Sequence, residues 1–151
     1  MNGSRKFFPI AVTALALAGA GIFGAASAGA GGRPLTAELA ASNEVGQPGN
    51  VGATGLAELT LNQGQGEICF ELEFDNLTSD PTRAHIHRGV AGVNGPVVVT
   101  FYETGDPALT EGCVPVDGAL VKEIRKNPAG FYVNVHNATA PAGAVRGQLS
   151  R

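Results

Sequence analysis

Alternation of apolar and polar residues in short segments is the feature that most constrains how this chain can fold. In "GEICFELEF", residues 66–74, every second side chain is apolar. A period of two is produced by a β-strand with one buried face, because successive side chains point to opposite sides of a sheet. The segment is therefore predicted to be a strand with two distinct sides: Ile68, Phe70, Leu72 and Phe74 facing the core, and Glu67, Cys69, Glu71 and Glu73 facing outward.

Six further segments have the same character, and residues such as Gly, Pro and Asn, which favour turns, separate them. The predicted strands are residues 34–40, 55–61, 66–74, 83–88, 95–102, 130–136 and 144–150. One helix is expected within residues 117–128, where Asp117 can cap it and Pro128 can end it. We therefore predict an all-β fold, a Greek-key β-sandwich or barrel of about seven short antiparallel strands.

The first 28 residues have the composition of a secretory signal peptide. Arg5 and Lys6 precede a long apolar run that ends in the small residues Ala26, Ser27 and Ala28. We expect cleavage after Ala28, a flexible stretch over residues 29–34, and one β-domain over residues 35–151. No membrane span is expected after cleavage, because no second apolar run is long enough. The predicted location is outside the cytosol, in the periplasm or the extracellular medium.

The chain has two cysteines, Cys69 and Cys113. An even number in an exported protein predicts a disulfide, because the compartments outside the cytosol are oxidising. Since alternation places Cys69 on an outer face, the segment with Cys113 is expected to be a loop that folds back over that face. Such a loop would shelter a patch of the sheet from solvent.

All three histidines of the chain fall on outer faces by the same alternation. The side chains expected inside are those of Ala84, Ile86, Phe131, Val133 and Val135. Those expected outside are Arg83, His85, His87, Tyr132, Asn134 and His136. Nothing in the sequence requires the two strands to be neighbours, so convergence of the histidines depends on the sheet order.

Two histidines on one strand, two positions apart, lie about 7 Å from each other on one face, which allows both to bind one metal ion. If the strands are neighbours, His85, His87 and His136 form a three-histidine site for copper or zinc. Tyr132 and Asn134 are then the expected hydrogen-bonding neighbours of the imidazoles. The alternative is that the histidines are structural and hydrogen-bond loops to the sheet.

The last predicted strand places Arg146 on the face opposite to Val145, Gly147 and Leu149. We expect Arg146 to form a structural ion pair with a carboxylate, Glu71 or Glu73.

Three segments together resemble one protein family. They are residues 37–61 ("AELAASNEVGQPGNVGATGLAELTL"), 84–99 ("AHIHRGVAGVNGPVVV") and 127–149 ("NPAGFYVNVHNATAPAGAVRGQL"). The combination resembles the CHRD domain of chordin and of secreted bacterial proteins, over about residues 35–149. The chain departs from it at Gly46, where the family leads us to expect proline, and at Asn137, where threonine usually follows the histidine. The resemblance implies an extracellular β-rich domain with no established enzymatic activity.

The alternating histidines are also similar to those of copper–zinc superoxide dismutases. Three histidines are too few for a histidine-bridged pair of metals, so the similarity allows only a single three-coordinate copper site. The net charge of −3 makes the chain a poor candidate for binding nucleic acid. No serine or cysteine lies in a nucleophile pattern, and no glycine-rich loop has the lysine of a phosphate site.

Two functions remain open. The first is a non-enzymatic secreted module that binds an extracellular or envelope component or has a structural role. The second is a secreted copper- or zinc-binding protein, with redox chemistry like that of superoxide dismutase as a further possibility.

Overall fold

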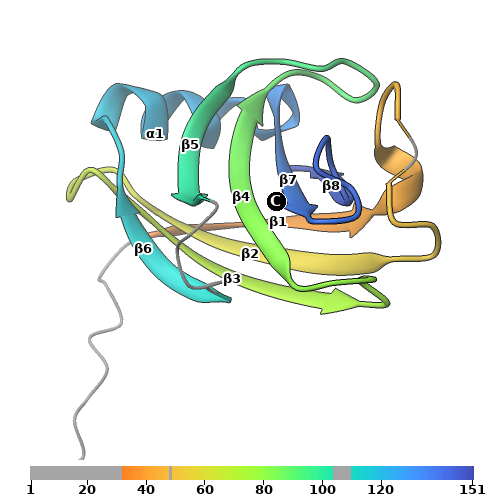
Figure 1. Cartoon of the computed structure of the whole chain (residues 1–151). Helices are drawn as coiled ribbons and strands as arrows, with labels where there is room; N and C mark the ends of the chain where they lie inside the picture. Colours follow the sequence, from red (N-terminus) through yellow and green to blue (C-terminus); the bar gives the residue numbers. More distant parts are fainter. Residues whose placement is uncertain (1–31, 48, 104–109) are drawn as a thin grey trace, which may run out of the picture.

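The computed structural model describes residues 32–47, 49–103 and 110–151. These residues form eight β-strands, one α-helix and two short 3-10 turns, which Figure 1 shows in sequence colours. The strands are β1 (Arg33–Ala40), β2 (Thr54–Asn62), β3 (Glu67–Asp75), β4 (Pro81–Arg88), β5 (Val97–Tyr102), β6 (Glu111–Pro115), β7 (Phe131–Asn137) and β8 (Val145–Gln148). The other elements are η1 (Ala41–Asn43), α1 (Gly118–Lys126) and η2 (Pro128–Gly130).

All eight strands belong to one antiparallel sheet, in the order β5-β4-β7-β8-β1-β2-β3-β6. The sheet curls so that its two edge strands, β5 and β6, contact each other, and the result is a nearly closed barrel (Figure 1). Phe70 of β3 stacks on Phe101 of β5 at a centroid distance of 4.4 Å, which fills the interior where the edges meet. The predicted all-β class is confirmed, and the architecture is the barrel rather than the two-sheet sandwich.

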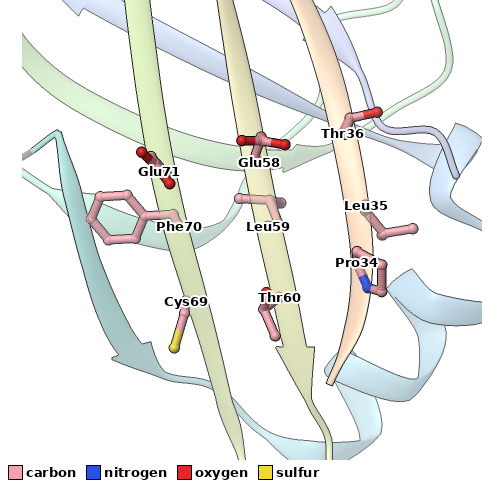
Figure 2. Close-up of a pocket in the computed structure, with 9 residues that line it drawn as sticks. All are labelled: Pro34, Leu35, Thr36, Glu58, Leu59, Thr60, Cys69, Phe70 and Glu71. Carbon is pink, nitrogen blue, oxygen red and sulfur yellow. The ribbon is translucent and has the colours of Figure 1, made fainter. Parts of the chain in front are cut away.

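The predicted alternation sets the two sides of the sheet. Figure 2 shows it on β3, β2 and β1, where Phe70, Leu59 and Leu35 form one row across the strands. The row of Glu71, Glu58 and Thr36 lies on one side of it, and the row of Cys69, Thr60 and Pro34 lies on the other. Phe70, Leu59 and Leu35 are buried, whereas Glu71 and Glu58 are exposed. The outer side of β1, β2 and β3 therefore faces solvent and is acidic, and the inner side forms the core.

The helix α1 follows the expected local rules. The Asp117 carboxylate accepts hydrogen bonds from the backbone N–H groups of Ala119 and Leu120, so it caps the helix. Val121 and Ile124 are fully buried, and the helix packs against β2 and β3 at one end of the barrel (Figure 1). The predicted helix is therefore confirmed.

Two expectations about the strands differ from the structure. An eighth strand, β6, was not predicted, because residues 111–115 include only one large apolar residue, Val114. Arg33, expected in a flexible N-terminal stretch, is the first residue of β1, and Pro34, the predicted start of that strand, is the second. The predicted signal peptide, residues 1–28, lies outside the described residues.

The third difference concerns the disulfide. Cys69 and Cys113 are bonded, as predicted, but Cys113 is not in a loop that folds over the sheet. It lies in β6 directly opposite Cys69 of β3, so the bond joins two adjacent strands. The disulfide therefore holds the short edge strand β6 in the sheet, and the shelter of the outer face must come from other segments.

Reduction of the disulfide is expected to destabilise the domain substantially. The bond links residues 44 positions apart, and closing a loop of that length is worth about 4 kcal/mol in the chain-entropy model. We expect the free energy of unfolding, measured by urea titration with and without reductant, to fall by about that amount. A C69A/C113A variant should match the reduced protein, and equal stability of the oxidised and reduced forms would contradict this role of the bond.

Candidate metal centre

The pairing of β4 with β7 brings the three histidines onto one patch. The opposite pairs are His85 with Asn134, His87 with Tyr132, and His136 with Arg83. Residues directly opposite in an antiparallel pair point to the same side of the sheet. Because Ile86 and Val133, the pair between them, are fully buried in the core, the histidines lie on the outer side.

This part of the outer face is covered. His85 is 4% exposed and His136 is 7% exposed, while His87 is half-buried. The cover comes from segments that each contact one imidazole: Gly95 in the β4–β5 loop, Glu103 after β5, and Pro141 in the β7–β8 loop. The loop that was expected to carry Cys113 plays no part in it.

The three imidazoles are close enough to share one ion. Nδ1 of His85 lies 3.4 Å from Nε2 of His136. One ring nitrogen of each histidine, His87 included, lies within 4.8 Å of the other two. Two ligands bound at about 2.1 Å with a tetrahedral angle are separated by about 3.4 Å. The pair His85–His136 already has that spacing, and the ligand atom of His87 lies within 4.8 Å of both.

Each imidazole has one nitrogen whose proton is assigned by its partner. Nδ1 of His87 lies 2.9 Å from the Gly95 carbonyl oxygen, and Nδ1 of His136 lies 3.1 Å from the Pro141 carbonyl oxygen. A carbonyl oxygen only accepts, so both nitrogens carry the proton. Nε2 of His85 lies 2.8 Å from the Glu103 carboxylate, and it donates in the same way.

The remaining nitrogens are those available to a metal ion, because each carries a lone pair when its ring is singly protonated. They are Nδ1 of His85, Nε2 of His87 and Nε2 of His136. Among the described residues, Nε2 of His87 is buried without a hydrogen-bond partner. Nδ1 of His85 and Nε2 of His136, 3.4 Å apart, need either a proton or a cation between them. A hydrogen-bond partner on the outer nitrogen of each ligating histidine is the usual arrangement around a bound metal.

Burial keeps two of these imidazoles uncharged. Burial lowers the pKa of His136 to about 4, and the positive charge of nearby Arg83 acts in the same direction. Burial also lowers the pKa of His87, although the hydrogen bond to the Gly95 carbonyl opposes this. Near neutral pH both rings are unprotonated, which is the form that binds metal.

The two predicted neighbours differ in their contacts. Tyr132 stacks on His87 with ring centroids 4.9 Å apart, and its hydroxyl accepts a hydrogen bond from the Gly95 N–H. Tyr132 therefore supports both the ring and the carbonyl that orients it. The Asn134 amide instead donates to the carboxylate of Glu44 and to the Val145 carbonyl, so its hydrogen bonds do not reach an imidazole.

Arg146 lies on the same outer face but does not pair with Glu71 or Glu73. Its guanidinium donates to Asn94 and to the carbonyl oxygens of Val90 and Val93, all in the β4–β5 loop. It also lies over the Tyr132 ring, 3.4 Å from the centroid. The expectation was wrong because Glu71 and Glu73 are on β3, three strands away from β8 in the sheet. Arg146, only 2% exposed, anchors the β4–β5 loop over the centre.

A cavity of about 330 Å³ opens beside His87 and His136. Glu44, Tyr132 and Arg146 also line it. Burial raises the pKa of Glu44 to about 7, although the hydrogen bond from Asn134 and the charge of Arg146 oppose this. The cavity gives an ion a route to the histidines, with one titratable carboxyl beside it.

The sequence pattern does not identify Gly95, Glu103 or Pro141. Each belongs to a loop or follows a strand end, where alternation does not apply. Gly95 has a clear reason to be glycine, since an added Cβ would lie 1.6 Å from the Arg88 carbonyl oxygen. The other two have no local signal, because they act only through contacts made in the folded chain.

Fold and centre together define an antiparallel β-barrel domain that has a buried three-histidine cluster on its outer side. A comparison with protein-family models matches the CHRD domain over residues 35–149. The chain belongs to the CHRD domain family. Gly46, where proline was expected, has φ +82°, which a proline ring does not allow.

Comparisons with curated proteins and with solved structures found no match. No helix in residues 32–47, 49–103 and 110–151 has the length and hydropathy required to cross a membrane.

Acidification of the metal-free protein is expected to lower its stability through the lowered pKa of His136. Its pKa is about 4 when folded and about 6.5 when unfolded, so the unfolded chain takes up the proton first. The contribution of the uncharged His136 ring to the free energy of unfolding is therefore complete above pH 6.5 and is lost as the pH falls towards 4. Between these limits the free energy of unfolding should fall, relative to a His136→Asn variant, by on the order of 2–3 kcal/mol.

Glu44 provides the control for this experiment, because its raised pKa acts with the opposite sign. Its contribution to stability is present at low pH and is lost as the pH rises through about 7. A Glu44→Gln variant should therefore show a steeper loss of stability on acidification than the unmodified protein. If the unmodified protein and His136→Asn lose stability equally as the pH falls, the pKa of His136 is not lowered in the folded protein.

Proposed function

We propose that this domain binds one transition-metal ion through Nδ1 of His85, Nε2 of His87 and Nε2 of His136. The observation that carries the proposal is the convergence of three imidazoles, each of which has its other nitrogen on a fixed acceptor. A structural role alone would need hydrogen bonds at the inner nitrogens too, since buried polar atoms without partners are costly. Nε2 of His87 has none among the described residues.

The ligand set favours copper or zinc. Neutral imidazoles bind both ions well, whereas calcium and magnesium prefer oxygen ligands. Three protein ligands leave a fourth position for water, a small molecule or a side chain of a partner. The carboxylate of Glu103, hydrogen-bonded to His85, would offset part of the positive charge of the ion.

We further propose that the domain acts after export, as a non-enzymatic module in the periplasm or the extracellular medium. The disulfide supports this proposal, because such bonds persist in oxidising compartments. The predicted signal peptide and the membership of the CHRD family also support it. An extracellular or envelope component is the proposed partner. Redox chemistry like that of superoxide dismutase is a separate hypothesis, which requires that the bound ion be copper.

Titration of the metal-free mature domain with Zn²⁺ and with Cu²⁺ tests the metal proposal. Calorimetry should give one ion per chain. A bound ion should also raise the melting temperature, since binding at 100 times Kd adds about 2.7 kcal/mol of stability. His87→Ala should abolish both effects and keep the β-rich circular dichroism spectrum, because His87 is half-buried and lies outside the core.

Gln65→Ala, at an exposed turn between β2 and β3, is the matched control and should bind like the unmodified protein. Absence of stoichiometric binding, or unchanged binding by His87→Ala, would reject the site. Elemental analysis of protein purified without chelator then identifies the ion that the domain acquires.

The β4–β5 loop offers a second test. In Gly95→Ala the added Cβ would collide with the Arg88 carbonyl, so the loop must shift and the Gly95 carbonyl must move away from His87. We expect metal affinity to fall at least tenfold although all three ligands remain, as happens when an outer hydrogen bond to a ligand is lost. Unchanged affinity in a folded Gly95→Ala variant would show that this carbonyl does not orient the ligand.

A further inference from the structure

A second concave site lies at the end of the barrel beside α1, away from the histidines. It is a cavity of about 280 Å³ lined by Arg33, Gln63, Lys122, Arg125, Lys126 and Arg151. We call these residues the basic pocket. Five of the eight lysines and arginines in the described residues line it, and none of its lining residues is acidic. They come from β1, the β2–β3 turn, α1 and residue 151, so the fold gathers them from distant parts of the chain.

The charges of the basic pocket are not neutralised by the protein. Within the described residues, no carboxylate lies within 4.0 Å of any of its five cationic groups. Arg125 donates to the neutral amide oxygen of Gln63 at 2.6 Å, and Arg151 donates to the Arg125 carbonyl at 3.3 Å. These acceptors orient two guanidinium groups and leave their charge in place. Nε of Arg125 is buried, and the described residues provide no partner for it.

The remaining arginines of the described residues are engaged elsewhere. Arg88 pairs with Glu123, Arg83 donates to the Pro141 carbonyl, and Arg146 is buried in the β4–β5 loop contacts. Arg83 keeps its charge, since its acceptor is neutral, but it does not line the basic pocket; the pocket holds most of the unpaired positive charge of the described residues. The acidic residues of the sheet, such as Glu58 and Glu71, lie on the outer side of the strands and do not line it (Figure 2).

This arrangement costs stability in the isolated domain. Lys122 and Lys126 are four positions apart on one helix face, where like charges repel. Arg125 and Lys126 in the last turn interact favourably with the helix dipole, which accounts for two of the five charges. Arg33 and Arg151 lie outside the helix and gain nothing from that dipole. An anionic ligand would turn the repulsion into attraction.

The lining of the basic pocket selects the kind of anion. Guanidinium and ammonium groups around a small cavity suit sulfate or phosphate oxygens. No aromatic side chain lines the pocket, so it offers no platform for stacked nucleic-acid bases. The large exposed apolar residues, Val51, Val90, Val93 and Val97, are not among its lining residues, so nothing there would insert into a lipid bilayer. We therefore expect the anionic group to belong to a hydrophilic molecule that is neither a nucleic acid nor a lipid.

We propose that the basic pocket binds the sulfate or phosphate ester groups of an anionic extracellular polysaccharide. It shares no residue with the histidine centre, so this function is independent of metal binding. The pocket accommodates one ester group with its sugar, and the exposed Lys122, Lys126 and Arg33 extend the contact along the chain of the polymer.

Binding of a labelled heparin oligosaccharide and of a phosphorylated mannan to the intact mature domain tests the proposal. Affinity should fall as salt is raised, because screening weakens exposed charge pairs. Lys122→Gln with Lys126→Gln should weaken binding at least tenfold and reduce the salt dependence. Both lysines are exposed, so circular dichroism should be unchanged. Whichever of the two polymers binds more tightly identifies the ester.

A control with the same change of net charge is Val51→Glu with Thr54→Glu. Thr54 pairs with Ala40, at the opposite end of β1 from Arg33, so these changes lie far from the basic pocket. Equal weakening in both double variants would show a general charge effect and overturn the proposal. Failure of both polymers to bind at physiological ionic strength, about 150 mM salt, would also overturn the proposal. Tighter binding of phosphatidylglycerol vesicles or of single-stranded DNA than of either polymer would overturn it as well. His87→Ala should bind the polymers normally, so this test and the metal test can fail separately.

Discussion

The antiparallel pairing of β4 with β7 is the interaction on which the rest of the structure depends. It joins His85 to His136 across 51 positions of sequence and sets which side chains share the outer face. A slip of one residue would turn the histidines into the core and Ile86 out of it. Because Ile86 and Val133 are both fully buried, the hydrophobic effect opposes that slip. The same burial that stabilises the barrel therefore positions the candidate ligands.

The cover over this face determines its chemistry. Every residue of β7 is buried, although alternation would leave half of them exposed. Glu103 and the carbonyls of Gly95 and Pro141 close over the imidazoles, and each accepts one hydrogen bond from a ring nitrogen. In an uncovered sheet the same histidines would be hydrated, with no preferred tautomer. Burial also lowers the pKa of His136, which keeps its lone pair available below neutral pH.

Charge is divided over the surface of the domain. Glu58, Glu71 and Glu111 are directly opposite one another on β2, β3 and β6, and their exposure to solvent limits the repulsion between them. The basic pocket occupies the end of the barrel beside α1, and the histidine centre lies on β4 and β7. A nearly closed barrel has several separate outer faces, which allows one small domain to carry a metal site and an anion site without shared residues.

Much of the fold could be predicted from the sequence, because alternation and capping are local. The alternation in residues 66–74 and 130–136 identified the inward side chains, and Asp117 identified the start of the helix. Two cysteines in a chain predicted to be exported were sufficient to predict their bond. The strand β6 was missed, because it is short, lies at an edge, and depends on the disulfide and on β3 more than on its own residues.

The sequence by itself determined that the three histidines point outward, since that follows from the period of a strand. Only the tertiary structure decided that they meet, because adjacency of β4 and β7 is a property of sheet order. It also decided that Arg146 supports the β4–β5 loop, and that Gly95, Glu103 and Pro141 orient the imidazoles. These contacts join segments far apart in the chain, and no local pattern encodes which loop will close over which face. The physical reason is that alternation specifies a direction, whereas a binding site requires a distance.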